Sequence, residues 1–330
     1  MSTAAGSPRA ALVHGDTLID LHDGVQALLQ EDGKPSDGLA VCEQIGEGVL
    51  GFIENATSAR ALADRVLTRA AEGTLPASVF QQAFAEAQLL SPLPRPRSMR
   101  DGYAFRQHVE TARRNRGLEM IPEFDQFPVF YFTNADAVVG PGPLPIGGGR
   151  LERLDFELEA AIVLGKSGRD VKAQDADELI FGLTIMNDWS ARALQMEEMK
   201  LSLGPAKGKD FATGLGPVLV TLDELLPRAQ KTERGLVFDL GMRGWVNGVQ
   251  LSQGNVNQMT WTFAQILERV SDGVSVHPGD VIGSGTCGTG CFLELNGSKI
   301  TNNQWLVPGD HVVLEIDGIG RLENTITREE

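Results

Sequence analysis

The stretch Leu154-Asp-Phe-Glu-Leu-Glu-Ala-Ala-Ile-Val-Leu164 alternates acidic and apolar residues and then becomes entirely apolar. On a strand, side chains two residues apart share a face, so Asp155, Glu157 and Glu159 are expected on one face. Neighbouring carboxylates there are about 6–7 Å apart at the backbone, which lets their oxygens approach one cation. Because the following run is apolar, part of this acidic face is expected to be buried, where like charges repel unless a cation or a proton intervenes. An amphipathic strand with one hydrated face is the alternative.

Around this stretch, segments rich in β-branched and aromatic residues predict further strands. They lie at 128–133, 155–164, 179–186, 217–221, 236–246, 280–284, 292–295 and 311–316. One helix is expected over 258–270, where apolar residues recur at helical spacing. Long alternation of strand and helix is absent, so a doubly wound parallel sheet is disfavoured. The pattern favours an α+β catalytic domain on a largely antiparallel or mixed sheet.

The first 90 residues predict a small mixed domain with strands over 10–13 and 17–21. Thr57 and Ser58 are suited to cap a helix that Gly73 ends. Three prolines within five positions follow, and they favour an extended connector. The sequence therefore predicts a small N-terminal domain, a proline-rich connector and a catalytic domain, at residues 1–90, 91–97 and 98–330.

The composition excludes several classes of function. The 330 residues include 29 basic and 44 acidic side chains, a net charge of −15, which argues against nucleic-acid binding. No apolar run reaches the about 18 residues of a membrane span and no secretory signal is visible, so a cytoplasmic protein is expected. The three cysteines, Cys42, Cys287 and Cys291, are expected to be reduced and to serve packing rather than metal binding.

Two motifs that suggest nucleotide binding are set aside. Gly283-Ser-Gly-Thr-Cys-Gly288 matches G-x-G-x-x-G, but a strand is expected after it, whereas a dinucleotide site needs a helix there. Gly165-Lys-Ser167 lacks the first glycine of a phosphate loop, because Ala160 stands at that position. No nucleotide cofactor is expected.

Between Ile185 and Gln195, Asn187 or Asp188 is expected to cap a helix that places Asp188, Arg192 and Gln195 on one face. This face is either an internal ion pair or part of a cation site with groups aimed at an anion.

Two other segments carry polar residues suited to ligand binding. The glycine-rich loop 204–216 holds Lys207, Lys209 and Thr213, which are either hydrated loop residues or ligand contacts. His108 ends the segment Asp101-Gly-Tyr-Ala-Phe-Arg-Gln-His108, and a single histidine is more often structural than catalytic.

Together these segments resemble the fumarylacetoacetate hydrolase family over about residues 90–314. The motifs that carry the resemblance are the segment 101–108, the Asp-x-Glu-x-Glu stretch, Met186-Asn-Asp-Trp-Ser-Ala-Arg192, Gly208-Lys-Asp-Phe211, Pro278-Gly-Asp-Val-Ile282, Ser284-Gly-Thr286 and Leu293-Glu-Leu295. The resemblance implies a mixed β-roll catalytic domain of the fumarylacetoacetase C-terminal type, a small N-terminal α+β domain, and usually a homodimer.

The resemblance also assigns site residues. The implied metal ligands are Asp101, Glu157, Glu159 and Asp188, with Lys209 and Thr213 near the metal. The implied catalytic residues are His108, Glu294, Lys209, Arg192 and Gln195. The implied substrate contacts are Tyr103, Tyr131, Arg192, Gln195, Lys209, Gly285 and Thr286.

The implied reaction is metal-dependent hydrolysis of a carbon–carbon bond in a 1,3-diketone or acylpyruvate, such as fumarylacetoacetate, in aromatic-compound catabolism. Mg²⁺ or Ca²⁺, or else Mn²⁺, would stabilise the departing enolate, while His108 takes a proton from water. A tyrosine of the family is Met199 here, and a substrate arginine has no clear counterpart between Arg113 and Arg116. The alternatives are an isomerase, decarboxylase or dehydratase acting on a 2-oxo acid through a metal-bound enolate, and a non-catalytic metal-stabilised binding protein.

Overall fold

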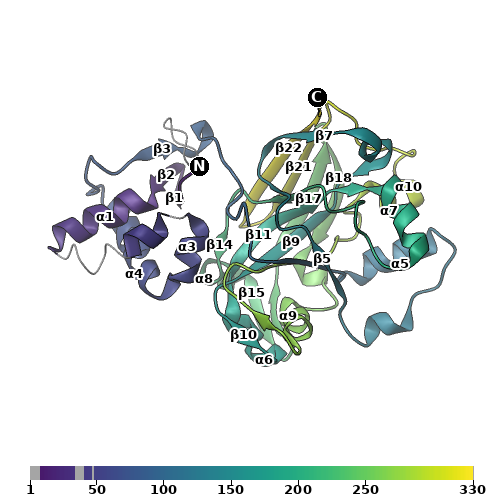
Figure 1. Cartoon of the computed structure of the whole chain (residues 1–330), viewed down its shortest axis with the longest axis horizontal. Coiled ribbons are helices and arrows are strands. Elements are labelled where there is room, and N and C mark those ends of the chain that lie inside the picture. Colours follow the sequence, from purple (N-terminus) through teal and green to yellow (C-terminus); the bar gives the residue numbers. More distant parts are fainter. Residues whose placement is uncertain (1–7, 34–40, 47, 330) are drawn as a thin grey trace. The chain divides into compact units, whose positions relative to one another are not determined.

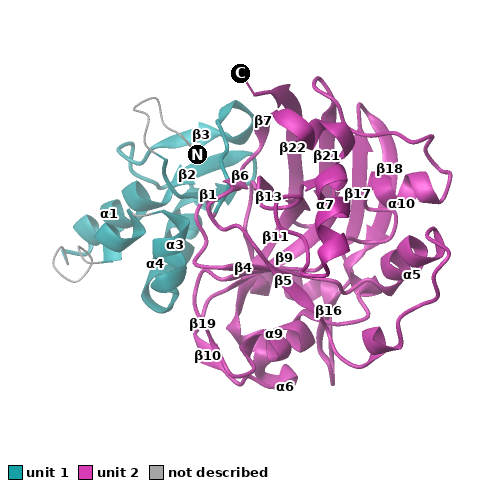
Figure 2. Ribbon diagram, turned by 45° about the vertical axis from the view of Figure 1, so that its right-hand side comes forward, with its two compact units in different colours: residues 1–92 teal, residues 93–330 magenta. Residues whose placement is uncertain are grey.

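The computed structural model describes residues 8–33, 41–46 and 48–329. The chain forms two compact units, residues 1–92 and 93–330, which Figure 2 shows in teal and magenta. No helix in the described ranges is both long and apolar enough to cross a bilayer.

The small unit combines an antiparallel three-stranded sheet of order β1-β2-β3 with helices. Its elements are β1 (Ala11–His14), β2 (Thr17–Asp20), α1 (Leu21–Glu31), α3 (Val49–Glu54), α4 (Ala56–Ala71) and β3 (Gln81–Ala83). Helix α1 begins directly after β2 because the Asp20 carboxylate accepts a hydrogen bond from the Asp23 amide. Helices α1 and α4 pack together over an apolar core that belongs to this unit alone.

The large unit is built on two sheets. The first has the order β5-β4-β20-β9-β11-β13-β6, with β14 paired to β11. Its strands are β4 (Met99–Gly102), β5 (Phe130–Thr133), β6 (Val138–Val139), β9 (Leu158–Leu164), β11 (Ile180–Asp188), β13 (Thr213–Leu215), β14 (Val220–Thr221) and β20 (Val281–Gly283).

The second sheet has the order β18-β17-β21-β22-β7. Its strands are β7 (Gly142–Ile146), β17 (Gly241–Val246), β18 (Val249–Asn255), β21 (His311–Ile316) and β22 (Gly320–Arg328). Strand β11 of the first sheet lies against β21 and β22 of the second (Figure 1). Apolar side chains from both sheets join in one core. The expected α+β class on a mixed sheet is therefore confirmed.

Short strand pairs and helices complete the large unit. The pairs are β8 (Leu154–Asp155) with β12 (Ser190–Ala191), β10 (Gly168–Arg169) with β19 (Ser275–Val276), and β15 (Ala229–Thr232) with β16 (Gly235–Phe238). The helices are α5 (Arg106–Arg114), α6 (Ala173–Ala176), α7 (Arg192–Glu198), α8 (Leu222–Leu225), α9 (Phe263–Ser271) and α10 (Phe292–Gly297).

The strand expected over 292–295 is wrong, because these residues begin helix α10. The Asp155 carboxylate accepts hydrogen bonds from the amides of Phe292 and Leu293, the first two of that helix, at 2.7 and 3.0 Å. An acceptor so distant in sequence cannot be read from the local pattern. The reason given for setting aside the G-x-G-x-x-G motif is therefore also wrong, since a helix does follow it, although its first amides are bonded to Asp155.

The expected strand 155–164 is interrupted, because β8 ends at Asp155 and β9 begins at Leu158. The three acidic residues of this stretch therefore do not share one strand face. Within the break, the Glu157 amide donates to the Asn187 side-chain oxygen at 2.9 Å, which takes the place of a ladder hydrogen bond.

Three expected helix starts also differ. Helix α4 begins at Ala56 with Asn55 at its N-cap, so Thr57 and Ser58 lie inside the helix and do not cap it. The helix expected from Asn187 or Asp188 begins only at Arg192, because β11 continues through Asp188. The helix expected over 258–270 corresponds to α9, which begins at Phe263 because Thr262 forms a capping box with Gln265.

Candidate metal centre and active site

Three carboxylates meet at one edge of the first sheet. Asp101 lies near the end of β4, Glu159 near the start of β9 and Asp188 at the end of β11. Strands β9 and β11 are antiparallel, so the start of one faces the end of the other, and β20 lies between β9 and β4. One carboxylate oxygen from each residue lies within 4.8 Å of the other two, and all three side chains are buried.

Few hydrogen-bond donors contact the carboxylate oxygens of this cluster. The Gly285 amide donates to Asp101 Oδ1 at 3.1 Å and to Glu159 Oε2 at 3.2 Å. Asp188 Oδ2 accepts from Lys209 Nζ and from the Tyr131 hydroxyl, each at 2.5 Å. Asp188 Oδ1 is buried and has no hydrogen-bond partner among the described residues. Converging carboxylates with an unsatisfied oxygen fit a cation that prefers oxygen ligands, such as Mg²⁺, Ca²⁺ or Mn²⁺.

Burial and mutual repulsion raise the pKa values of all three carboxyl groups. Burial and the charge of Asp188 raise the pKa of Asp101 to about 7. Burial and the charge of Asp101 raise the pKa of Glu159 well above its ordinary value. Burial likewise raises the pKa of Asp188, although Lys209 opposes the shift. Without a cation, the cluster therefore keeps protons near neutral pH.

These pKa shifts predict that the affinity of the cluster for a metal ion depends on pH. Because a cation must displace the proton of Asp101, affinity for Mn²⁺ should fall about tenfold between pH 8 and pH 6.

The same group makes the stability of the metal-free protein depend on pH. The ordinary pKa of Asp101 is 3.8 and the folded value is about 7, so between these two pH values the folded metal-free protein binds more protons than the unfolded chain. Its stability should therefore fall as pH rises from about 4 to about 7, and bound Mn²⁺ should remove that loss. Calorimetric titration and thermal unfolding at several pH values would test both; an affinity independent of pH would contradict the prediction.

Glu157, the fourth expected metal ligand, lies beside the cluster rather than within it. Its carboxylate accepts from Arg192 Nη2 at 2.6 Å and from Lys209 Nζ, and the same ammonium also binds Asp188. Burial acts to raise the pKa of Glu157, but Arg192 and Lys209 outweigh it, so the pKa is below its ordinary value. Glu157 is therefore an ionised carboxylate joined to the cluster through one lysine, and its role as a metal ligand stays a prediction.

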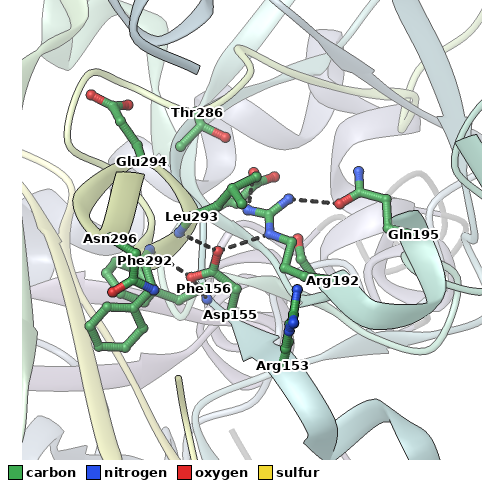
Figure 3. A network of polar contacts seen from close by, with 12 residues as sticks. Arg153, Asp155, Phe156, Arg192, Gln195, Thr286, Phe292, Leu293, Glu294 and Asn296 are labelled. Atoms are coloured by element: carbon green, nitrogen blue, oxygen red, sulfur yellow. Dashed lines mark hydrogen bonds and ion pairs between the residues drawn. The ribbon is translucent and has the colours of Figure 1, made fainter. Parts of the chain in front are cut away.

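Asp155 connects Arg192 to helix α10 (Figure 3). Its Oδ2 accepts from Arg192 Nε at 2.8 Å, while its two oxygens also accept from the first amides of α10. Arg192 in turn donates to Gln195 Oε1 at 2.9 Å. The alternating acidic stretch predicts that Asp155 shares a cation-binding face with Glu157 and Glu159, whereas its oxygens are bonded to Arg192 and to the amides of α10. Asp155 thus fixes two functional segments relative to each other.

Removing Arg192 should therefore destabilise the protein strongly. Arg192→Met leaves Asp155 and Glu157 buried without their guanidinium, so the free energy of unfolding should fall by about 3–5 kcal/mol. Denaturant unfolding of the metal-free protein would measure it. The matched control is Arg153→Met, which removes an exposed guanidinium nearby and should change stability by less than about 0.5 kcal/mol. Equal effects of the two substitutions would contradict the assignment.

A histidine–carboxylate pair lies where α5 packs against α10. His108 Nδ1 is 2.7 Å from Glu294 Oε2, and both side chains are buried. The other oxygen of Glu294 accepts from the Thr289 amide at 2.9 Å, and the Tyr103 ring meets the His108 ring edge-on at 5.9 Å. With Nδ1 bonded to the carboxylate, Nε2 is the nitrogen left to accept a proton.

The remaining expected site residues surround these groups. Thr286 donates to Glu159 at 3.4 Å, and Thr213 pairs with Asp188 in the strand register. Lys207 is an exception, because it is exposed and paired with Asp210 outside the cluster.

The two places where the sequence departs from the family motifs, Met199 and the segment 113–116, lie on more exposed segments. The Met199 side chain is 49% exposed at the end of α7. Burial raises the pKa of Tyr103, and the charge of Arg116 opposes that shift, so Arg116 is electrostatically coupled to a predicted substrate contact.

Comparison with known proteins reveals clear relatives. The family profile "Fumarylacetoacetate (FAA) hydrolase C-terminal" matches residues 97–327. Fumarylacetoacetase of Oryza sativa subsp. japonica is 33% identical over 243 residues, which cover 58% of this chain and 56% of that protein. Oxaloacetate tautomerase YisK of Bacillus subtilis is 31% identical over 252 residues, which cover 75% of each chain. The chain thus spans little more than half the length of the rice protein.

A solved structure shares the fold across nearly the whole chain. Maleylpyruvate hydrolase of Sphingobium sp. SYK-6, in complex with a manganese(II) ion and pyruvate, has a TM-score of 0.66 at 19% identity. The alignment covers 98% of this chain and 97% of that one. At this identity the likeness establishes the architecture alone.

Proposed function

Because this chain belongs to the fumarylacetoacetate hydrolase family, we propose that it is a metal-dependent hydrolase that cleaves a carbon–carbon bond in a 1,3-diketone or acylpyruvate. The observation that carries the proposal is the buried His108–Glu294 pair beside a three-carboxylate cluster. Hydrolysis needs a base for water, and a histidine oriented by a carboxylate is suited to that step. We further propose Asp101, Glu157, Glu159 and Asp188 as the ligands of Mg²⁺, Ca²⁺ or Mn²⁺.

His108 and Glu294 have distinct roles in the proposed hydrolysis. A divalent cation, when bound, supplies positive charge that stabilises an enolate leaving group. His108 Nε2 accepts a proton from water as the oxygen attacks the carbonyl carbon, and Glu294 stabilises the imidazolium that results. The same imidazolium then donates its proton to the carbon atom of the leaving group. The products are two acids, or an acid and a ketone.

Positive groups hold the oxygens on which charge develops. Burial acts to lower the pKa of Lys209, but Asp188 and Glu157 outweigh it, so the ammonium stays protonated. Arg192 likewise keeps its charge between Asp155 and Glu157. Because both groups are fixed by buried ion pairs, they need not reorganise as the oxyanion forms. Gln195 completes this set by its hydrogen bond to Arg192.

Tautomerisation of a 2-oxo acid is the second candidate. It is supported by oxaloacetate tautomerase YisK, which aligns over three quarters of both chains. A tautomerase moves one proton between carbon and oxygen and does not require attack by water. In that case His108 would exchange a proton with substrate carbon.

One assay separates the two activities. Purified protein with Mg²⁺ or Mn²⁺ is mixed with a series of acylpyruvates, β-diketones and oxaloacetate, while enol absorbance is followed and products are identified by nuclear magnetic resonance. Hydrolysis gives two fragments in equal amounts, whereas tautomerisation changes absorbance without fragments. A chelator should abolish either reaction. Loss of enol absorbance without new carboxylate products from every diketone would overturn the hydrolase proposal.

Four further features complete the proposal. We propose that residues 1–90 form a separate domain, that the enzyme acts in aromatic-compound catabolism, and that it works in the cytoplasm as a homodimer. Light scattering of the purified full chain would test the dimer, since a monomer of 35.5 kDa is readily distinguished from twice that mass.

A further inference from the structure

A second group of potential metal ligands lies next to the carboxylate cluster. A ring nitrogen of His108, a carboxylate oxygen of Glu157 and Sγ of Cys291 all lie within 4.8 Å of one another. The three side chains are buried and come from separate segments: α5, the break before β9, and the residue preceding α10. The sequence assigned Cys291 to packing alone.

The donor atoms differ from those of the first cluster. Three carboxylates favour Mg²⁺, Ca²⁺ or Mn²⁺, whereas nitrogen, sulfur and oxygen together favour Zn²⁺. Zinc bonds of about 2.0–2.3 Å place tetrahedral ligand atoms about 3.3–3.8 Å apart. Atoms already within 4.8 Å therefore need to close by at most about 1.0–1.5 Å, and a water molecule can supply the fourth ligand.

The groups behind these ligands also suit zinc. A histidine that binds zinc usually donates its other ring N–H to a carboxylate, and His108 has that partner in Glu294 at 2.7 Å. Glu157 is fixed by Arg192 and Lys209, so its position is preorganised. The sulfur ligand is held at the start of α10, whose first amides are bonded to Asp155.

Charge in this network leaves room for a second cation. Six buried carboxyl groups face two permanent cations, Arg192 and Lys209; the carboxyl groups are Asp101, Asp155, Glu157, Glu159, Asp188 and Glu294. One divalent ion at the three-carboxylate cluster still leaves an excess of negative charge when all six are ionised. A second divalent ion would offset part of this excess, even when it binds Cys291 as a thiolate.

We propose that His108, Glu157 and Cys291 form a zinc-selective inhibitory site beside the three-carboxylate cluster, with Glu157 as the carboxylate shared by the zinc ion and the Mg²⁺ ion. Zinc binds the Cys291 sulfur as thiolate and releases its proton to solvent, so one proton leaves for each ion bound. The ion also takes the lone pair of the His108 nitrogen that would accept a proton from water. The inhibitory part rests on the proposed function, whereas the binding part does not.

Cobalt(II) is the probe for binding, because cobalt–thiolate coordination gives a near-ultraviolet charge-transfer band. Co²⁺ is added to the full-length protein already saturated with Mg²⁺. The band is expected in the wild type and in Cys287→Ser, a control that alters a second buried thiol outside the three-ligand group. It should be lost in Cys291→Ser and in Cys291→Ala. No band in the wild type, or a band retained without the Cys291 sulfur, would overturn the site.

Inhibition is then measured on the Mg²⁺-loaded enzyme. Zn²⁺ should inhibit the wild type, and Cys291→Ser should raise the inhibitory concentration at least tenfold without changing the rate in the absence of zinc. Equal inhibition of both proteins would refute the inhibitory role. If no substrate is cleaved at all, the proposed function fails, while the cobalt band still decides whether the site exists. Thermal unfolding of each variant verifies that it is folded.

Discussion

Replacing His108 with alanine is expected to lower kcat for carbon–carbon cleavage by about 10²–10⁴-fold, the usual contribution of a positioned general base. The reason is geometric: His108 is the imidazole bonded to Glu294 at 2.7 Å, and it is buried beside the three-carboxylate cluster. Affinity for Mn²⁺ should not change, because His108 is not among those three carboxylates. Steady-state kinetics and calorimetric Mn²⁺ titration of the same preparation would measure both quantities.

Two further variants make this result specific. Glu294→Gln should cause a smaller loss, about 10- to 100-fold, because the ring keeps a neighbour but loses the charge that stabilises its protonated form. His277→Ala removes an exposed imidazole and should leave kcat unchanged. Full cleavage by His108→Ala would refute the general-base role, and a loss of Mn²⁺ binding would assign His108 to the metal instead.

The second large effect is expected from Glu159→Gln, which should act in opposite directions on the free and metal-bound proteins. Affinity for Mn²⁺ should fall by about 100-fold or more, since the charge of the ligand set controls how tightly hard cations bind. In the metal-free protein at pH 8, the same change removes a carboxyl group whose pKa is raised by burial and by the charge of Asp101, and which therefore destabilises the fold at pH values above its ordinary pKa. The temperature of unfolding should therefore rise by about 2–4 °C for each kcal/mol relieved.

A loss of Mn²⁺ affinity together with a gain in metal-free stability distinguishes a metal ligand from a residue that only supports the fold. Asp177→Asn is the matched control, because Asp177 is a buried carboxyl outside the cluster that pairs with Lys231. It should lower the unfolding temperature with and without Mn²⁺ and leave Mn²⁺ affinity unchanged. Should Glu159→Gln destabilise the metal-free protein and keep its Mn²⁺ affinity, the three carboxylates would not form a cation site.

Local sequence predicted those parts of the fold in which local and tertiary preferences agree. The apolar runs in β21 and β9 both form strands, because buried strands need such residues wherever they pack. The start of α10 was not predictable, since Asp155 stabilises it from far along the chain. Likewise, β11 continues through Asp188 because β9 and β13 pair with it, and a capping residue in isolation cannot reveal that.

The candidate site was predictable in its residues but less so in its contacts. Order and spacing of the motifs marked Asp101, Glu159, Asp188 and His108, and the structure brings the first three together. The two cations that neutralise Glu157 come from α7 and from a loop, so the sequence alone placed this carboxylate among the metal ligands. Cys291 was treated as packing because its neighbours in space lie in other segments.

The groups proposed for bond cleavage are buried on strands and helix starts, whereas Met199 is exposed at the end of a short helix. Exposed substitutions usually alter stability by less than about 0.5 kcal/mol, so mutations there are seldom removed by selection for folding. Substitutions at such positions can therefore change substrate specificity during evolution while the reactive centre stays intact.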